Sequence, residues 1–236
     1  MSQFRLETRP DGLQRVITDG LASINGRECA LELVGGVTPD QAERVLRYIG
    51  DYIASSRQKI KPGETMRYGW STLRFVQDEG DAALSIEELE DPYSTTSDTF
   101  ARGAAKAIQI LRSQDEAVKR NGLSSPAHHP HRSERAVICR RLSPNAPWRV
   151  LVFDRIKARQ ADQSGWFVGC GSSTHDHNDV NELASLHLVY LSERDPRIVE
   201  YLAMPEDSRV VFDQRRVIVF NPGAQEGHVD STAVLS

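Results

Sequence analysis

The chain has 236 residues, of which 39% are hydrophobic and 26% are charged, and its formal net charge is −4. This composition is typical of a globular domain protein, and no apolar run reaches the length that spans a bilayer. The weak negative charge argues against general binding to nucleic acid, which requires a basic stripe along the phosphate backbone. We therefore expect a protein partner with a basic surface, and neither nucleic acid nor a membrane.

The cysteines and the first residues of the chain bear on its compartment. Cys29, Cys139 and Cys170 are odd in number and far apart, and no two of them have C-x-x-C spacing. This pattern argues against a disulfide framework and against a thiolate zinc site. Residues 1–10 are polar and lack the apolar centre of a secretory signal. We expect a cytoplasmic protein with reduced cysteines, no cofactor and no metal.

The first predicted elements are a strand and a helix. Residues 27–35 alternate between apolar and polar side chains and end in a glycine pair, which is typical of a strand. Thr38 is followed by a proline at the first helical position and by Gln41 at the third. This spacing forms a capping box, so we expect a helix to begin here. Apolar residues then recur every three or four positions, which predicts one buried face.

A hairpin and a second helix complete the first half of the chain. Residues 66–76 and 82–88 are predicted to be strands joined by a turn at 78–81. Residues 98–120 carry an apolar stripe with helical spacing, and Asn121 with the following glycine ends it. The first half is therefore expected to pack two helices on a small sheet.

The second half is predicted to be a separate domain. Residues 123–134 contain two prolines and three serines without an apolar period, which is typical of a linker. Residues 183–191 fit either a strand or a helix. The other expected elements are strands at 136–139, 148–153, 164–168 and 216–220, a short helix at 195–202 and a polar, frayed tail at 223–236.

These elements predict an α+β fold of two small domains, each a mostly antiparallel sheet packed with one or two helices. The expected limits are an N-terminal domain at 1–122, a linker at 123–134, a second domain at 135–222 and a tail at 223–236.

Residues 162–178 combine an aromatic pair, glycines, a cysteine and two histidines. Cys170 could be a nucleophile, with His175, His177 or His187 as its base. His175 and His177, with a carboxylate, could instead bind a metal. A simpler interpretation is a core strand anchored by Trp166 and followed by a loop that faces a partner.

Residues 78–91 hold seven carboxylates and no basic side chain. The run is predicted to be the exposed turn and edge of a hairpin, which makes a solvated acidic face its plainest interpretation. The alternative is a surface that docks a basic protein, where charge attraction sets partner choice and association rate.

Several features of the second half, in this order, resemble the immunity protein 33 family of bacterial polymorphic-toxin and secretion-system loci. The resemblance covers about 136–220. It rests on the Ser-Gly-Trp strand at 164–168, the asparagine-bearing loop at 178–181, the Asp-Pro-x-Ile-x-x-Tyr-Leu helix at 195–202, and a Pro205 turn leading to a strand with Phe212. The resemblance implies a non-enzymatic inhibitor that binds a toxin made by the same cell.

The leading hypothesis is thus a cytoplasmic immunity protein that occludes the active site of a cognate toxin or secretion-system effector. One alternative is a metal- or thiol-dependent hydrolase that uses Cys170 and the loop from His175 to His177. Another is an effector adaptor or chaperone, and the oligomeric state stays open. The expected toxin contacts are Asp78, Glu79, Asp81, Glu87, Glu88, Glu90 and Asp91 in the acidic run, and His175, Asp176, His177, Asn178 and Asp179 in the loop.

Overall fold

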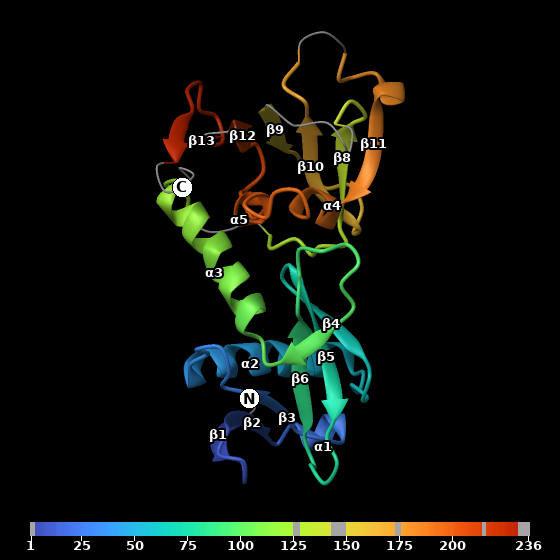
Figure 1. Ribbon diagram of the computed structural model, residues 1–236, viewed down its shortest axis with the longest axis vertical. Helices are drawn as coiled ribbons and strands as arrows, with labels where there is room; N and C mark the ends of the chain where they lie inside the picture. The colour runs from blue at the N-terminus through green and yellow to red at the C-terminus, as the bar shows by residue number, and fades with distance from the viewer. Residues whose placement is uncertain (1–2, 125–127, 143–149, 173–175, 214–215, 231–236) are drawn as a thin grey trace. The chain divides into compact units, whose positions relative to one another are not determined.

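The structure, a computed structural model, describes residues 3–124, 128–142, 150–172, 176–213 and 216–230. These residues form an α+β fold with two mixed seven-stranded sheets, as the sequence predicts (Figure 1). The backbone contacts divide the chain into two compact units. Unit 1 comprises Met1–Pro92 and Thr96–Gln109, and unit 2 comprises Tyr93–Thr95 and Ile110–Ser236. The division falls within a helix, and the domain limits expected from the sequence stay a prediction.

The sheet of unit 1 has the strand order β1-β2-β3-β6-β5-β4, and β7 pairs with β6. All neighbouring strands are antiparallel except β3 and β6, which are parallel. The strands are β1 (Gln3–Thr8), β2 (Gln14–Asp19), β3 (Cys29–Glu32), β4 (Thr65–Tyr68), β5 (Ser71–Gln77), β6 (Leu84–Leu89) and β7 (Phe100–Arg102). The helices are α1 (Ala22–Asn25), α2 (Pro39–Ser56) and the first part of α3 (Ala105–Arg120).

Helix α2 confirms the prediction made from the capping box. The hydroxyl of Thr38 accepts a hydrogen bond from the backbone N–H of Gln41, and the side chain of Gln41 accepts one from the N–H of Thr38. Val45, Leu46 and Ile49 are fully buried and belong to the same apolar cluster as the core side chains of β3, β5 and β6. The amphipathic face of α2 therefore closes the core of unit 1.

Two expectations for unit 1 are wrong. The helix predicted at 98–120 begins only at Ala105, because Phe100–Arg102 pairs with β6 as strand β7. Gly103 separates the two elements with φ +101, where an added Cβ would lie 2.5 Å from Val34 Cγ2. Strand β6 is not a hairpin edge either, because β5 pairs with one side of it and β3 and β7 pair with the other.

The sheet of unit 2 has the strand order β11-β8-β10-β9-β12-β13-β14, and only β8 and β10 are parallel. The strands are β8 (Arg135–Cys139), β9 (Val150–Arg155), β10 (Gln163–Gly169), β11 (Leu183–His187), β12 (Arg209–Asp213), β13 (Arg216–Phe220) and β14 (His228–Asp230). The helices are the second part of α3, the 3-10 helix η1 (Val180–Glu182), α4 (Val189–Ser192) and α5 (Ile198–Tyr201).

Trp166 anchors the core of unit 2, as the sequence predicts. Its side chain is buried, and its indole N–H donates a hydrogen bond of 2.9 Å to the carbonyl of Leu202. Phe153 contacts the indole edge to face, and Phe212 contacts Phe153 in the same way. The ring of Tyr201, on α5, packs against Phe212, so α5 covers this face of the sheet.

The expectation of a frayed tail is wrong for β14. Asp230 is buried, and its carboxylate accepts hydrogen bonds from the hydroxyl of Tyr201 at 2.9 Å and from Nε of Arg120 at 2.7 Å. A third hydrogen bond, of 3.1 Å, comes from the side chain of Asn121. This carboxylate satisfies buried donors of unit 2, and it therefore fixes the segment that carries it. Among the described helices, none combines the length and the apolar character needed to cross a membrane.

Candidate functional site

The first part of the acidic run turns its carboxylates toward arginines of unit 1. Asp78 accepts hydrogen bonds from Nη1 of Arg102 at 2.8 Å and from the hydroxyl of Ser85 at 2.9 Å. The bond to Arg102 holds the pKa of Asp78 below its ordinary value. Asp81 forms an ion pair with Arg15. These two carboxylates therefore stabilise the fold of unit 1.

The carboxylates on β6 are buried, contrary to the exposed edge expected from the sequence. Glu87 pairs with Nη2 of Arg74 at 2.6 Å. Glu88 is 4% exposed and accepts the backbone N–H groups of Lys106 at 2.9 Å and Ala107 at 2.7 Å. It thereby accepts hydrogen bonds from N–H groups in the first turn of α3. These groups have no acceptor within the helix, because no helical carbonyl lies four residues before them.

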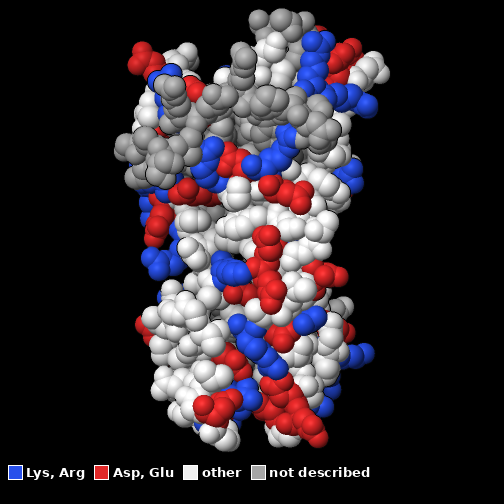
Figure 2. All heavy atoms as spheres, in the orientation of Figure 1, with Lys and Arg blue, Asp and Glu red and all other residues white. Residues whose placement is uncertain are grey.

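Three of the predicted contacts in the acidic run are exposed. They are Glu79, which lies in the turn after β5, and Glu90 and Asp91, which follow β6. Acidic and basic side chains are interleaved on the face drawn in Figure 2. The exposed acidic surface is therefore much smaller than the run of seven carboxylates suggests.

Unit 2 contains a hollow of about 930 Å³. The strand register places Ser185, Val137, Phe167 and Asp154 in one row across β11, β8, β10 and β9. This row lies on the face opposite the buried side chains of the core, because side chains alternate along each strand. All four residues line the hollow, together with the half-buried Leu183. The floor is therefore partly apolar.

Arg155 lines the hollow and is an unusual buried charge. It is 5% exposed, and its Nε and Nη1 atoms have no hydrogen-bond partner among the described residues. Burial lowers the pKa of Arg155, although the carboxylates of Glu134 and Glu206 act in the opposite direction. Ser208, also at the hollow, has a buried hydroxyl that likewise lacks a partner among the described residues. Two buried side chains beside the hollow thus carry polar atoms that lack a hydrogen-bond partner among the described residues.

The charged residues at the hollow are mostly basic. Asp154 is hydrogen-bonded to Nε of Arg209 at 2.5 Å, which neutralises one of the two lining carboxylates. The charged lining residues are Arg135, Arg155, Lys157 and Arg159 on the basic side and Asp154 and Asp207 on the acidic side. The hollow therefore favours an anionic group over a cationic one.

The predicted loop residues border this hollow. His177 and Asn178 line it, and Asp176, Asn178 and Asp179 are exposed. The carboxylate of Asp176 accepts the backbone N–H of Asn178 at 2.8 Å, which fixes the turn locally. His175 lies outside the described residues. The part of the loop that the structure describes is thus ordered by its own side chains and available to a partner.

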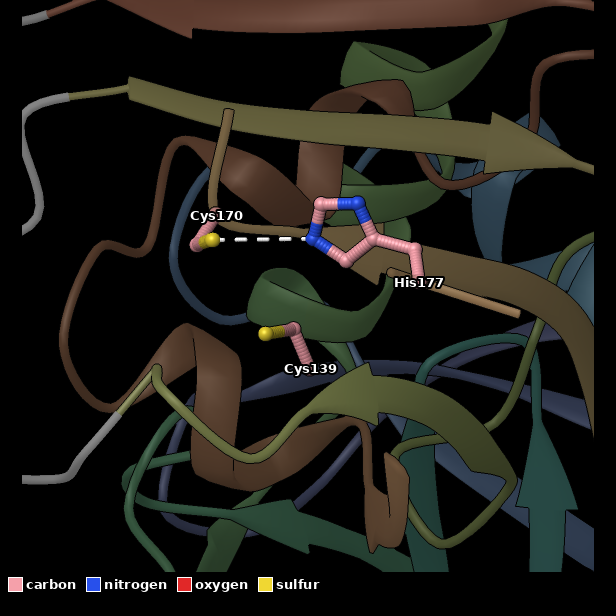
Figure 3. Close-up of side chains that lie close together, drawn as sticks. All are labelled: Cys139, Cys170 and His177. Atoms are coloured by element: carbon pink, nitrogen blue, oxygen red, sulfur yellow. Dashed lines mark hydrogen bonds between the residues drawn. The ribbon is translucent and has the colours of Figure 1, made fainter. Parts of the chain in front are cut away.

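A thiol and imidazole cluster lies beside the loop. Nε2 of His177 is 3.5 Å from Sγ of Cys170, and with Cys139 their ligand atoms all lie within 4.8 Å of one another (Figure 3). Cys139 is buried, and this burial raises the pKa of its thiol. His187, another candidate base, instead contacts the carbonyl of Ser133 at 2.6 Å. The structure therefore brings Cys170 to His177 and adds Cys139, which sequence spacing did not single out.

The part of the chain that holds these features matches a known protein family. Residues 113–221 match the family model of the Imm33-like domain, in agreement with the resemblance to the immunity protein 33 family. The hollow and the thiol cluster both lie within this segment. No curated protein and no solved structure matches the chain. The family match suggests an immunity domain and a binding role, and it favours a protein without catalytic activity.

Proposed function

We propose that this chain, through its Imm33-like segment at 113–221, is an immunity protein that binds a cognate toxin and blocks the toxin's active site. The observation that carries the proposal is the hollow on the sheet of unit 2. All of its lining residues fall within the matched segment. It offers a partly apolar floor and mostly basic charged residues, which are features of a binding surface for an acidic segment, and it includes Arg155, whose Nε and Nη1 have no hydrogen-bond partner among the described residues.

The chemistry of the hollow defines the toxin segment that it accepts. A carboxylate of the toxin would pair with Arg155 and offset the cost of burying this charge. Apolar atoms beside that carboxylate would pack against Val137, Phe167 and Leu183. The segment is therefore expected to be acidic and partly apolar, and the arginine gives it a fixed orientation.

The exposed residues predicted from the sequence extend this contact. Asp176, Asn178 and Asp179 adjoin the hollow, and we keep them, with His177 and His175, as proposed toxin contacts. In unit 1 the exposed Glu79, Glu90 and Asp91 remain proposed contacts to a basic part of the toxin surface. Asp78, Asp81, Glu87 and Glu88 were also predicted to contact the toxin. We propose that their carboxylates affect toxin binding through the negative charge of unit 1 and through the fold that they stabilise.

Co-expression with the toxin-like product encoded beside this gene tests the proposal. Growth rescue together with nanomolar binding, about −12 kcal/mol by calorimetry, is the expected result. Arg155→Met should weaken binding by at least about tenfold, because it removes a charged hydrogen-bond donor from the lining of the hollow. The matched control is Arg112→Met, since Arg112 is exposed on α3 and outside the hollow.

The other outcomes separate the rival functions. Binding without growth rescue would identify an effector adaptor or chaperone. The absence of both binding and growth rescue would contradict the proposal. If the Arg155→Met protein and the wild type bind the toxin with equal affinity, the contact lies outside the hollow. The exposed carboxylates would then be tested as toxin contacts.

A thiol-dependent hydrolase is the second candidate, and it rests on the 3.5 Å contact between Cys170 and His177. A histidine this close to a thiol can accept its proton and activate it as a nucleophile. Alkylation by iodoacetamide at limiting concentration tests this function. Rapid labelling of Cys170 that His177→Gln abolishes would support the hydrolase, whereas equally slow labelling of all accessible thiols would contradict it.

A further inference from the structure

We propose that Cys139, Cys170 and His177 bind a zinc ion in unit 2. Cys139 ends β8, whereas Cys170 and His177 both follow β10, and the ligand atoms of the three side chains lie within 4.8 Å of one another. Figure 3 shows the ring nitrogen of His177 facing the sulfur of Cys170, with Cys139 beside them. The proposal does not depend on toxin binding.

The distances fit tetrahedral zinc. Bonds of about 2.3 Å to sulfur and about 2.0 Å to nitrogen place the sulfur and nitrogen of such a site about 3.5 Å apart. The observed distance between Sγ of Cys170 and Nε2 of His177 is 3.5 Å. Two sulfurs on one zinc are about 3.8 Å apart, which lies within the 4.8 Å limit that encloses the cluster. Small side-chain rotations would therefore complete the geometry.

The parallel pairing of β8 and β10 brings the two thiols to the same edge of the sheet. Val168 on β10 pairs with Ile138 on β8, and each cysteine follows its partner residue within two positions. The imidazole of His177 then contacts the ring of Phe167 edge to face, with 5.9 Å between the ring centroids. Because the sheet and this aromatic contact fix the ligands, an ion would cross-link β8 to the residues after β10.

Charge and ligand chemistry favour zinc. Two thiolates balance the double charge of the ion, and the imidazole binds in its neutral form, so the half-buried site becomes neutral. Sulfur and imidazole ligands select zinc over calcium or magnesium. Three protein ligands leave one position for water or a partner side chain.

Metal content of the purified chain tests the proposal. The full chain is produced in zinc-containing medium under reducing conditions and dialysed, and zinc is measured by mass spectrometry. About one zinc per chain is expected, as in other single-ion sites. Cobalt in place of zinc should give a thiolate-to-metal charge-transfer band. Less than a tenth of an ion per chain, on the order expected for contamination, together with no cobalt band would overturn the proposal.

Variants locate the ion. Cys170→Ser and His177→Gln, at half-buried positions, should each weaken zinc binding by more than about tenfold, the loss that even outer-shell mutations cause. Cys29→Ser and His187→Gln are the controls, because both residues lie outside the cluster. Cys139→Ser is the third ligand test, with circular dichroism to establish that it folds. Zinc retained at wild-type affinity in Cys170→Ser and His177→Gln would contradict the site.

A disulfide between Cys139 and Cys170 is the competing outcome. It would require the sulfurs to approach to about 2.05 Å and would leave His177 without a role. Intact mass under non-reducing conditions distinguishes the two, because a disulfide lowers the mass by two hydrogens and blocks zinc binding. A disulfide found in protein purified without oxidant would overturn the zinc proposal.

Discussion

The guanidinium of Arg155 lies over the indole ring of Trp166, with 5.3 Å between Cζ and the ring centroid. The indole belongs to the core of unit 2, and its edge-to-face contact with Phe153 fixes its plane. The same guanidinium leaves Nε and Nη1 without hydrogen-bond partners among the described residues. Stacking on an aromatic ring thus holds this buried charge in place.

Arg155→Met should separate binding from stability. Loss of this buried charge, whose Nε and Nη1 have no hydrogen-bond partner among the described residues, is expected to leave the free energy of unfolding unchanged or to raise it by about 1 kcal/mol. Urea denaturation of both proteins measures this change. Inorganic phosphate should raise the unfolding midpoint of the wild type more than that of the variant, because Arg155 is one of the four basic residues at the hollow. A loss of about 2 kcal/mol or more would instead make Arg155 a structural residue.

Asp230→Ala should destabilise unit 2 strongly. The substitution leaves the Arg120 guanidinium and the buried Tyr201 hydroxyl without the acceptor that they share. Breaking a buried charged pair in this way typically costs about 3 kcal/mol. Burial raises the pKa of Tyr201, so its hydroxyl keeps its proton at neutral pH and continues to need an acceptor. Chemical denaturation followed by tryptophan fluorescence measures the loss.

A milder variant and a control sharpen this test. Tyr201→Phe removes one donor and leaves the ion pair intact, so about 1 kcal/mol is expected. Asp213→Ala is the control, because its carboxylate pairs with Arg216 at the surface. If Asp230→Ala costs no more than this control, then β14 contributes little to the stability of unit 2.

Local sequence signals predicted those elements whose causes are local. The capping box of Thr38 and Gln41 defines the start of α2, because both hydrogen bonds form within one helical turn. The strand around Trp166 was also predicted, since alternation and a large apolar side chain mark a core strand. Strands β1, β2 and β14 were not predicted. Strands β1 and β14 lie at sheet edges, and most of their side chains are exposed, so they show little apolar alternation.

The candidate site depends on contacts between segments far apart in sequence, which composition and spacing do not reveal. The acidic run looked solvated because Arg15 and Arg102, which neutralise Asp81 and Asp78, lie elsewhere in the chain. Cys139 looked like an isolated cysteine because only parallel strand pairing brings it to Cys170. His177 and its loop were singled out from the sequence as a loop that could face a partner, and the structure places His177 at the hollow and beside Cys170.

Glu88→Gln should reduce the stability of unit 1 without a direct effect on toxin affinity. An amide oxygen replaces the carboxylate that accepts the backbone N–H groups of Lys106 and Ala107, and about 1–2 kcal/mol should be lost. Charge reversal of the exposed Glu79, Glu90 and Asp91 should change stability by less than about 0.5 kcal/mol and should lower affinity for a basic toxin surface. Urea denaturation and calorimetry measure the two quantities. If Glu88→Gln lowers the affinity for the toxin and leaves the free energy of unfolding unchanged, Glu88 contacts the toxin directly.

Asp78→Asn should destabilise unit 1 in a pH-dependent way. The hydrogen bond from Arg102 lowers the pKa of Asp78 below its ordinary value of 3.8. A carboxyl whose pKa is lower in the folded state contributes stability above its unfolded pKa, and this contribution is lost as the pH falls through the folded pKa. The variant should therefore lose about 1–2 kcal/mol at pH 7, and the difference from wild type should shrink below about pH 4.

Urea denaturation at pH 7 and pH 3 compares this variant with the wild type and with Asp51→Asn. Asp51 is exposed on α2, so its substitution should have little effect at either pH. A loss for Asp78→Asn that stays equal at both values would mean that packing, and not the charge, is responsible. A difference that disappears at pH 3 would show that this carboxylate of the acidic run stabilises the fold through its pairing with Arg102.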